Sequence, residues 1–431
     1  MKEMPRGETS FIARNRKGLL RLTAVWCAMG VILFVLTPRL SPVLLLLATV
    51  APAAWSLADA RPLAWRHFSG LTIALVLAGI YLCFNASWSL SPSSAQVALA
   101  TYFSLLLVTH IVLNGLRHNA TDVLRSMARG LVAGMLIAGA AMCLEVLSQQ
   151  WMHRTLMSLL PGLQPNPRDM SVEDGWVIHL EPYLINRNVT VLTLLFWPTL
   201  LAIRLVSSQG RPRFLLAGLV PVAVAILGSK HATSKIAFVG SAITFGALAH
   251  SPAAARRGVV LGWIAIIMLV IPIATLMYRS ELYLASWLPR SAQHRIVIWG
   301  YTSQLLGKTP IFGAGIDAAR ALNDSDSYAP FAPDSDFRVT TGHHSHNVYL
   351  QAWYETGAFG ALMLLAIGLL ICKSLAQASQ DAQPHLYATF VTCALLAGSS
   401  FSLWTAWLMA SLGLLAGFAM VGAVLQKSAS Q

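Results

Sequence analysis

A histidine in the second half of the chain has the setting of a general base. His346 and Asn347 are followed after nine residues by Gly357 and then Gly360, where an apolar run begins. We expect His346 to Thr356 to form a short surface helix, with the glycines permitting a close, tilted junction with the next helix. An imidazole with an ordinary pKa near 6.5 is mostly neutral at neutral pH and accepts a proton from a hydroxyl group. His346 is therefore a candidate base at the mouth of a helical bundle.

A second segment that could do chemistry precedes this histidine. Residues 291–306 predict an amphipathic helix that Ser291 caps and Gly307 ends, with Arg295 and Trp299 one turn apart. Beside a membrane, such a helix lies along the interface or covers a cavity. Taken alone, Arg295 indicates a solvated side chain or a contact with lipid phosphate.

Acids and histidines in the same region leave a metal site open as an alternative. The Asp324-x-Asp326 pair has no glycine at the sixth position of a calcium loop and no glutamate at the twelfth. Its surroundings, rich in Ser, Ala and Pro, favour a solvated loop, so we expect no metal and no cofactor. A divalent ion held by the acids is the alternative, and its candidate ligands are Asp317, Asp324, Asp326, Asp334, Asp336, His343, His344 and His346.

The composition indicates an integral membrane protein. Of the 431 residues, 56% are hydrophobic and 11% are charged, which excludes a large soluble catalytic domain. The 30 Lys and Arg outnumber 17 Asp and Glu, and the net charge of +13 favours anionic lipids or phosphate-bearing partners. The basic residues are scattered among short loops, so we expect no nucleic acid partner. All five cysteines lie inside apolar runs and predict no disulfide framework.

We expect an all-α polytopic membrane protein. A membrane crossing needs about 20 apolar residues, so the hydrophobic share accommodates about 12 transmembrane helices. Basic residues flank the first run and recur at alternate connections, which predicts a cytoplasmic N-terminus and, with an even count, a cytoplasmic C-terminus. The apolar runs lie near 22–37, 43–58, 70–89, 95–115, 129–147, 188–205, 214–229, 236–249, 258–278, 357–374, 385–400 and 404–425.

Two long connections, 148–187 and 279–356, fall on the non-cytoplasmic side in this topology. Long loops in a compact membrane protein are usually functional. We therefore divide the chain into residues 1–278 with helices 1 to 9, a large external loop at 279–356 carrying short helices and the His346 motif, and residues 357–431 with helices 10 to 12 and a short tail.

A transporter or flippase is the alternative from another functional class. It predicts repeat symmetry and charges near the membrane midplane, which the sequence does not display. The polar residues His110, Asn85 and Glu145 lie near helix ends, where headgroups or water would satisfy them. Most tryptophans and tyrosines near span ends indicate an interfacial belt; we expect Trp299 and Tyr354 to contact substrate instead.

These motifs resemble the O-antigen ligase and Wzy-C superfamily of bacterial inner-membrane glycosyltransferases. The similarity lies in His346-Asn347, nine residues, Gly357-x-x-Gly360, the Arg295-x-x-x-Trp299 helix and the Pro310-Ile-Phe-Gly313-x-Gly315 turn, and in the layout of about 12 spans with a large periplasmic loop. The resemblance implies a GT-C-like fold with a lipid-facing groove. It implies catalytic roles for His346 and Arg295, and structural or substrate roles for Asn347, Trp299, Tyr354, Gly313, Gly315, Gly357 and Gly360.

The family also implies a basic residue, commonly Arg, in a short periplasmic turn before the Arg295 helix. The segment Ser229 to Lys235 stands in that place, and Lys235 keeps the charge but lacks the bidentate phosphate fork of Arg. Arg187, at the polar start of the sixth span, and Lys230 are further cations on the same side. We expect Lys235, Arg187 and Lys230 to bind the pyrophosphate of the donor.

The function implied by the resemblance is that of an O-antigen ligase in the inner membrane of a Gram-negative bacterium. It would transfer O-polysaccharide from undecaprenyl pyrophosphate to a sugar hydroxyl of the lipid A core, at a periplasmic site, without a metal and with inversion. Its partners are the lipid-linked O-antigen, the lipid A-core oligosaccharide and membrane lipids. An O-antigen polymerase and a protein O-oligosaccharyltransferase use the same donor and remain alternatives.

Overall fold

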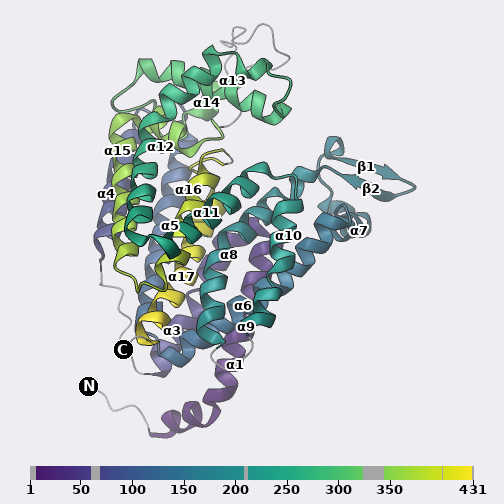
Figure 1. The fold of residues 1–431 in the computed structure, drawn as a ribbon, viewed down its shortest axis with the longest axis vertical. Coiled ribbons are helices and arrows are strands. Elements are labelled where there is room, and N and C mark those ends of the chain that lie inside the picture. The colour runs from purple at the N-terminus through teal and green to yellow at the C-terminus, as the bar shows by residue number, and fades with distance from the viewer. Residues whose placement is uncertain (1–5, 60–67, 208–211, 324–343, 400, 430–431) are drawn as a thin grey trace.

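The computed structural model describes residues 6–59, 68–207, 212–323, 344–399 and 401–429. Long helices run side by side in a bundle, and α13 (Arg290–Leu305) lies at one end of it (Figure 1). We call this the α13 end, and the opposite one, where α1 begins and α17 finishes, the terminal end. The bundle contains α1 (Arg6–Leu36), α2 (Ser41–Leu47), α3 (Val50–Ala58), α4 (Gly70–Ala86), α5 (Pro92–His118), α6 (Thr121–Leu147), α8 (Asn186–Val206), α9 (Pro212–Ala217), α10 (Val220–Gly228), α11 (Ala232–His250), α12 (Pro252–Arg279), α15 (Val348–Ala376), α16 (Gln383–Ala397) and α17 (Ala406–Ala429).

The prediction of an all-α polytopic membrane protein is confirmed. Within the described residues, nine helical stretches are long and apolar enough to cross a membrane, one of them formed by the short helices between Pro38 and Ala58. Each of the 12 expected apolar runs corresponds to a helix or a helix pair. The other three runs form α4, the α9–α10 pair and α16, which fall short of the length of those nine.

The core is centred on α8, whose side chains are mostly buried between α6, α11, α16 and α17. Close packing of α1 on α6 depends on two glycines spaced four apart. A Cβ atom at Gly130 would lie 2.7 Å from the Cβ of Cys27, and one at Gly134 would lie 2.8 Å from the Cβ of Val31. Small residues at this spacing let transmembrane helices approach closely, where van der Waals packing stabilises their contact.

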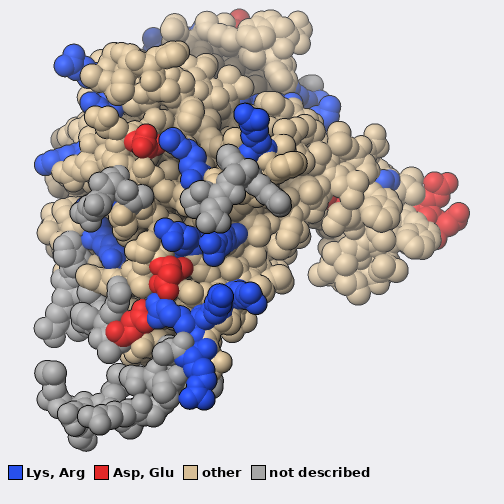
Figure 2. Space-filling view, turned by 60° about the horizontal axis from the view of Figure 1, so that its bottom comes forward, with Lys and Arg blue, Asp and Glu red and all other residues tan. Residues whose placement is uncertain are grey.

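Basic side chains gather at the terminal end (Figure 2). Arg16 joins three helices there: its Nη1 lies 2.8 Å from Asp59 Oδ1, after α3, and its Nε lies 2.8 Å from Asp122 Oδ2 at the start of α6. Further basic residues occupy the last turns of the helices that finish at this end, namely Arg117, His118, Arg204, His250, Lys373 and Lys427.

The two long connections lie at the α13 end (Figure 1). The first forms α7 (Trp151–Leu159) and an antiparallel hairpin of β1 (Met170–Glu173) and β2 (Trp176–Leu180). The second contains α13 and α14 (Ala319–Asn323). The expected helix at 291–306 is present, but its N-cap is Pro289, so the expectation of a cap at Ser291 is wrong. Ser291 lies inside the first turn because the helix starts one residue earlier.

Candidate active site

The turn that carries Gly313 and Gly315 is bonded to a break in α15. Gly357 has φ 64° and ψ −168°, so the helix that starts at Val348 is interrupted there before it continues into the bundle. Ala314 N donates to Tyr354 O at 2.9 Å, and Ala358 N donates to Pro310 O at 2.9 Å. The turn thus supplies hydrogen-bond partners for backbone groups near the break in α15. The break lies where the sequence predicts a junction between a short helix and a span.

The glycines are needed for this close approach. Gly313 has φ 73° and Gly315 has φ 99°, in the region that L-residues with a Cβ rarely occupy. A Cβ at Gly357 would lie 2.6 Å from Gly313 N, and one at Gly315 would lie 2.8 Å from Ser89 N. At Gly360, a Cβ would collide with the Thr356 side chain.

Polar side chains at the end of α4 hold the same junction from the other side. Tyr81 Oη donates to Thr356 O at 2.7 Å, and Asn85 Nδ2 donates to Phe312 O at 2.8 Å and to Glu355 O at 3.1 Å. Asn85 is buried, so the expectation that headgroups or water satisfy it is wrong. Glu145, also buried, instead accepts a hydrogen bond from Met152 N at 2.6 Å.

A buried carboxylate, Glu355, lies beneath the turn. It accepts hydrogen bonds from Gln351 Nε2 at 3.1 Å, from Ala319 N at 3.4 Å and, closely, from Trp404 Nε1. These donors come from α15, from α14 and from the segment before α17. Glu355 therefore fixes three segments around the loop that carries His346.

Asn347 caps α15 and positions the histidine before it. Its Oδ1 accepts from Tyr349 N and Leu350 N, both at 3.1 Å, which satisfies two otherwise unpaired donors of the helix. His346 has φ 53°, its N donates to His344 Nδ1 at 3.1 Å, and the two imidazole rings lie 4.1 Å apart. The structure therefore gives Asn347 a structural role next to a half-buried His346.

Helix α13 is joined to the histidine loop through Trp299. Its Nε1 donates to Ser345 O at 2.9 Å, and Arg295 lies one turn earlier on α13. Burial lowers the pKa of the Arg295 guanidinium. Burial, and then the charge of Arg295, lower the pKa of His231 to about 4. Arg295 therefore lies close to the turn before α11 as well as to the loop of His346.

The three other candidate cations lie at the α13 end, on α8, on α11 and in the turn before α11. Lys230 is exposed in the turn before α11 and Lys235 is half-buried in its first turn. Arg187 is in the first turn of α8, and its Cζ lies 5.8 Å from the centre of the Trp407 ring. The rings of Trp407 and Phe401 lie 4.9 Å apart, and that of Phe401 lies 6.4 Å from His231. Two aromatic side chains thus connect Arg187 with the turn that approaches Arg295.

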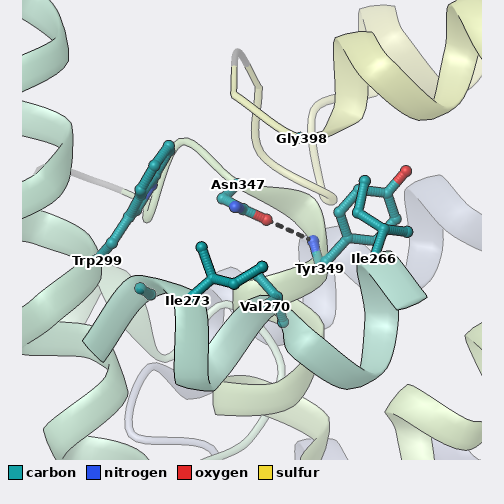
Figure 3. Close-up of a pocket in the computed structure, with 8 residues that line it drawn as sticks. Ile266, Val270, Ile273, Trp299, Asn347, Tyr349 and Gly398 are labelled. Carbon is teal, nitrogen blue, oxygen red and sulfur yellow. Dashed lines mark hydrogen bonds between the residues drawn. The ribbon is translucent and has the colours of Figure 1, made fainter. Parts of the chain in front are cut away.

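An apolar cavity of about 150 Å³ opens beside the motif (Figure 3). Trp299 and Asn347 contribute to one side of it and Tyr349 to another, with aliphatic residues of α12 between them (Figure 3). Its lining residues are Ile266, Val270, Ile273, Ala274, Trp299, Asn347, Tyr349 and Gly398. A cavity of this character accommodates hydrocarbon next to Trp299 and Asn347.

Comparison with known proteins identifies the region that contains this arrangement. Residues 217–365 match the model of the family described as O-Antigen ligase. This part of the chain is similar to an O-antigen ligase domain. The expected resemblance is thereby confirmed, and the matched region includes α11, α12, α13, the 310–315 turn and the His346 motif.

Two curated relatives carry names that propose a polysaccharide ligase. One, from Rickettsia conorii, is 29% identical over 140 residues, which are 31% of this chain and 32% of the relative. The other, from Rickettsia typhi, is 26% identical over 133 residues, which are 30% of this chain and 31% of the relative. The aligned part of the chain spans about a third of the length of either relative.

The structure also bears on two other expectations, the substrate contact of Tyr354 and the alternative metal site. Tyr354 is 4% exposed in a hydrophobic cluster with Tyr349 and Leu350, which favours its structural role over sugar stacking. No group of three or more potential metal ligands is present in the described part of the chain. Of the acids considered for a metal, Asp317 forms an ion pair with Arg320 at 2.7 Å, and Asp324, Asp326, Asp334 and Asp336, together with His343, lie outside the described residues.

The sequence analysis did not select three residues of this site, namely Glu355, Tyr81 and His231. Their contacts form only when α4, α11 and α15 pack together. Of these three, Glu355 could have been selected from the sequence, since it is a carboxylate near the start of an otherwise apolar helix. An unpaired charge there is costly, so a partner is expected.

Proposed function

We propose that the protein is an O-antigen ligase that transfers a polysaccharide from a lipid-linked pyrophosphate donor to a sugar hydroxyl of a lipid A-core acceptor. The O-antigen ligase domain and the names of the two rickettsial relatives support a ligase-type glycosyltransferase. The observation that supports the proposal is the Trp299–Ser345 hydrogen bond, which joins the helix that carries Arg295 to the loop that carries His346. A cation and a base then lie at the same end of the helical bundle. Transfer of a glycan from a membrane-bound pyrophosphate requires both groups there.

In the proposed step, the acceptor hydroxyl attacks the anomeric carbon of the donor sugar. A new carbon–oxygen bond forms while the bond to the pyrophosphate oxygen breaks, and undecaprenyl pyrophosphate leaves with the electron pair. The hydroxyl proton passes to the imidazole of His346. Attack from the face opposite the pyrophosphate inverts the configuration at the anomeric carbon.

The leaving pyrophosphate gains negative charge, which fixed cations stabilise. Arg295 is half-buried, so its charge acts with little screening by water. Lys235, Lys230 and Arg187 extend the cationic lining toward α8 and α11 and would hold the outer phosphate oxygens. This cation set would replace a divalent ion, so the reaction is expected to proceed without one.

The donor tail and the site must meet at the membrane surface. The cavity beside Asn347 is apolar and would receive the first isoprene units of the donor while the pyrophosphate reaches Arg295. The α13 end would then face the periplasm and the terminal end, rich in Lys and Arg, the cytoplasm, in a bacterial inner membrane.

The test is glycan transfer by the purified protein in liposomes that contain lipid-linked O-antigen and a lipid A-core acceptor, with EDTA present. We expect product from the wild type and at least a hundredfold less from His346→Ala. His250→Ala, which changes an exposed histidine at the far end of α11, is the matched control and should transfer normally.

The other outcomes separate the alternatives. Transfer to a second lipid-linked repeat would indicate a polymerase, and transfer to a protein acceptor would indicate a protein O-oligosaccharyltransferase. Activity that EDTA abolishes and Mg²⁺ restores would move the catalytic assignment to the aspartates. Full activity of His346→Ala would contradict its role as a base.

A further inference from the structure

Helix α7 exposes its apolar face and makes its contacts with its polar face. Met152, Leu156 and Leu159 recur at helical spacing on one side of α7, and Leu159 is 65% exposed. Leu163, in the short turn Pro161–Leu163 that follows, is also exposed. None of the nine residues of α7 is buried. A helix on a water-exposed surface normally has the opposite arrangement, with its apolar stripe toward the protein.

The polar face of α7 is bonded to the β-hairpin. Arg154 Nη1 donates to Ile178 O at 2.6 Å, and Ser158 Oγ accepts from Val177 N at 2.8 Å. Ile178 and Val177 both belong to β2. The hairpin therefore fixes the rotation of α7 so that its leucines point away from it.

The start of α7 is fixed to the end of a membrane-spanning helix. Glu145, in the last turn of α6, accepts from Met152 N at 2.6 Å and pairs closely with the imidazole of His153. The turn between the helices holds Gln150 at φ 64°, which makes α7 depart sharply from α6. In Figure 1, α7 and the hairpin project sideways from the bundle at the α13 end.

Exposed apolar side chains follow one another from the last turns of α6 to the start of α7. Leu144 is 49% exposed and Leu147 is 68% exposed on the last turns of α6, and Trp151, 55% exposed, follows at the start of α7. Since the outer surface of α6 faces lipid hydrocarbon, the surface that continues it at the helix end meets the headgroup and upper acyl region.

We propose that α7 is an in-plane membrane anchor, with the face formed by Met152, Leu156, Leu159 and Leu163 inserted into the leaflet at the α13 end. The occupant of this face is the lipid of that leaflet. The hairpin tip, with Glu173 and Asp174, stays in water on the other side of the helix. The anchor holds the 148–185 connection at a fixed depth relative to the bundle.

Site-directed fluorescence in vesicles tests the anchor. In a background with the five native cysteines replaced by alanine, Leu156→Cys and Leu159→Cys carry an environment-sensitive label, and Glu173→Cys at the hairpin tip is the matched control. The full chain is placed in phosphatidylethanolamine and phosphatidylglycerol vesicles with a lipid nitroxide or with aqueous iodide as quencher. We expect the labels at 156 and 159 to lose several-fold more emission to the nitroxide than the label at 173, and several-fold less to iodide.

Two results would overturn the proposal. Equal quenching of all three labels by iodide would place the leucine face in water. Protection of the 156 and 159 labels from both quenchers would mean that protein covers the face, such as a second copy of the chain. Because labelling changes the face itself, a photoreactive lipid added to the unmodified protein gives an independent measurement: cross-links must map to residues 151–163, and their absence there would contradict the anchor.

Discussion

Among single residues, Arg295 offers the sharpest test of the proposed chemistry, because it lies one turn before Trp299, which bonds the His346 loop, and its charge lowers the pKa of His231. Arg295→Ala should lower glycan transfer about a hundredfold, since one oriented charge contact contributes about 3 kcal/mol to a transition state. Arg295→Lys keeps the charge but not the bidentate fork, so we expect an intermediate loss. The control is Arg290→Ala, an exposed arginine at the start of the same helix, which should transfer normally. Equal rates for Arg295→Ala and wild type would remove Arg295 from the mechanism.

The buried His231 predicts a pH dependence of stability. Burial first, and then the charge of Arg295, lower its pKa to about 4, whereas an unfolded chain holds this imidazole near 6.5. The unfolded state therefore binds the proton more tightly, so the stabilisation is complete above pH 6.5 and is lost as the pH falls toward 4. The largest loss is about 3 kcal/mol. Thermal unfolding in detergent should give a Tm that falls less steeply over this window in His231→Gln than in wild type or in His250→Gln. Identical slopes in all three would contradict the assignment.

Of the elements, the break in α15 depends most on a single residue. A non-glycine residue at φ 64° costs about 1 to 3 kcal/mol, and in Gly357→Ala the new Cβ would also press on the 310–315 turn. We expect this variant to lower the Tm by several degrees and to reduce glycan transfer, because the turn and the His346 loop shift together. Gly307→Ala is the matched control, since no heavy atom lies within 4 Å of the added Cβ and its φ is ordinary. A wild-type Tm for Gly357→Ala would mean that the break tolerates a side chain.

The elements also mark how far the sequence could predict this structure. The apolar runs and the short helix after Asn347 were predictable because hydropathy and glycine spacing are local signals. The β-hairpin was missed although Asp174-Gly175, both at positive φ, is a typical tight hairpin turn. The contacts of Glu355 with Trp404 and of His231 with Arg295 could not be predicted, because these partners come from segments distant in the chain.

The whole molecule combines two ends of different character. The terminal end carries most of the basic flanks and an ion-pair network around Arg16, while the α13 end carries the O-antigen ligase motif and both long connections (Figures 1 and 2). The parity of the helices was predictable, since runs and flanking charges determine it jointly. The grouping of Arg187, Lys235 and Arg295 at one end follows from that parity. The distances between these three residues do not follow from the parity, because the tilt and packing of the helices determine them.

Sidedness is the prediction that belongs to the whole molecule. Because connections rich in Lys and Arg remain in the cytoplasm, the terminal end should face the cytoplasm and the α13 end the periplasm. In the cysteine-free background, Glu173→Cys at the hairpin tip should react with a membrane-impermeant maleimide added to cells with a permeabilised outer membrane. Ser251→Cys, exposed between α11 and α12 at the terminal end, should react only after the inner membrane is opened. The reverse pattern would place His346 and Arg295 in the cytoplasm. A ligase that uses a periplasmic donor would then be excluded, whatever the activity of the purified protein.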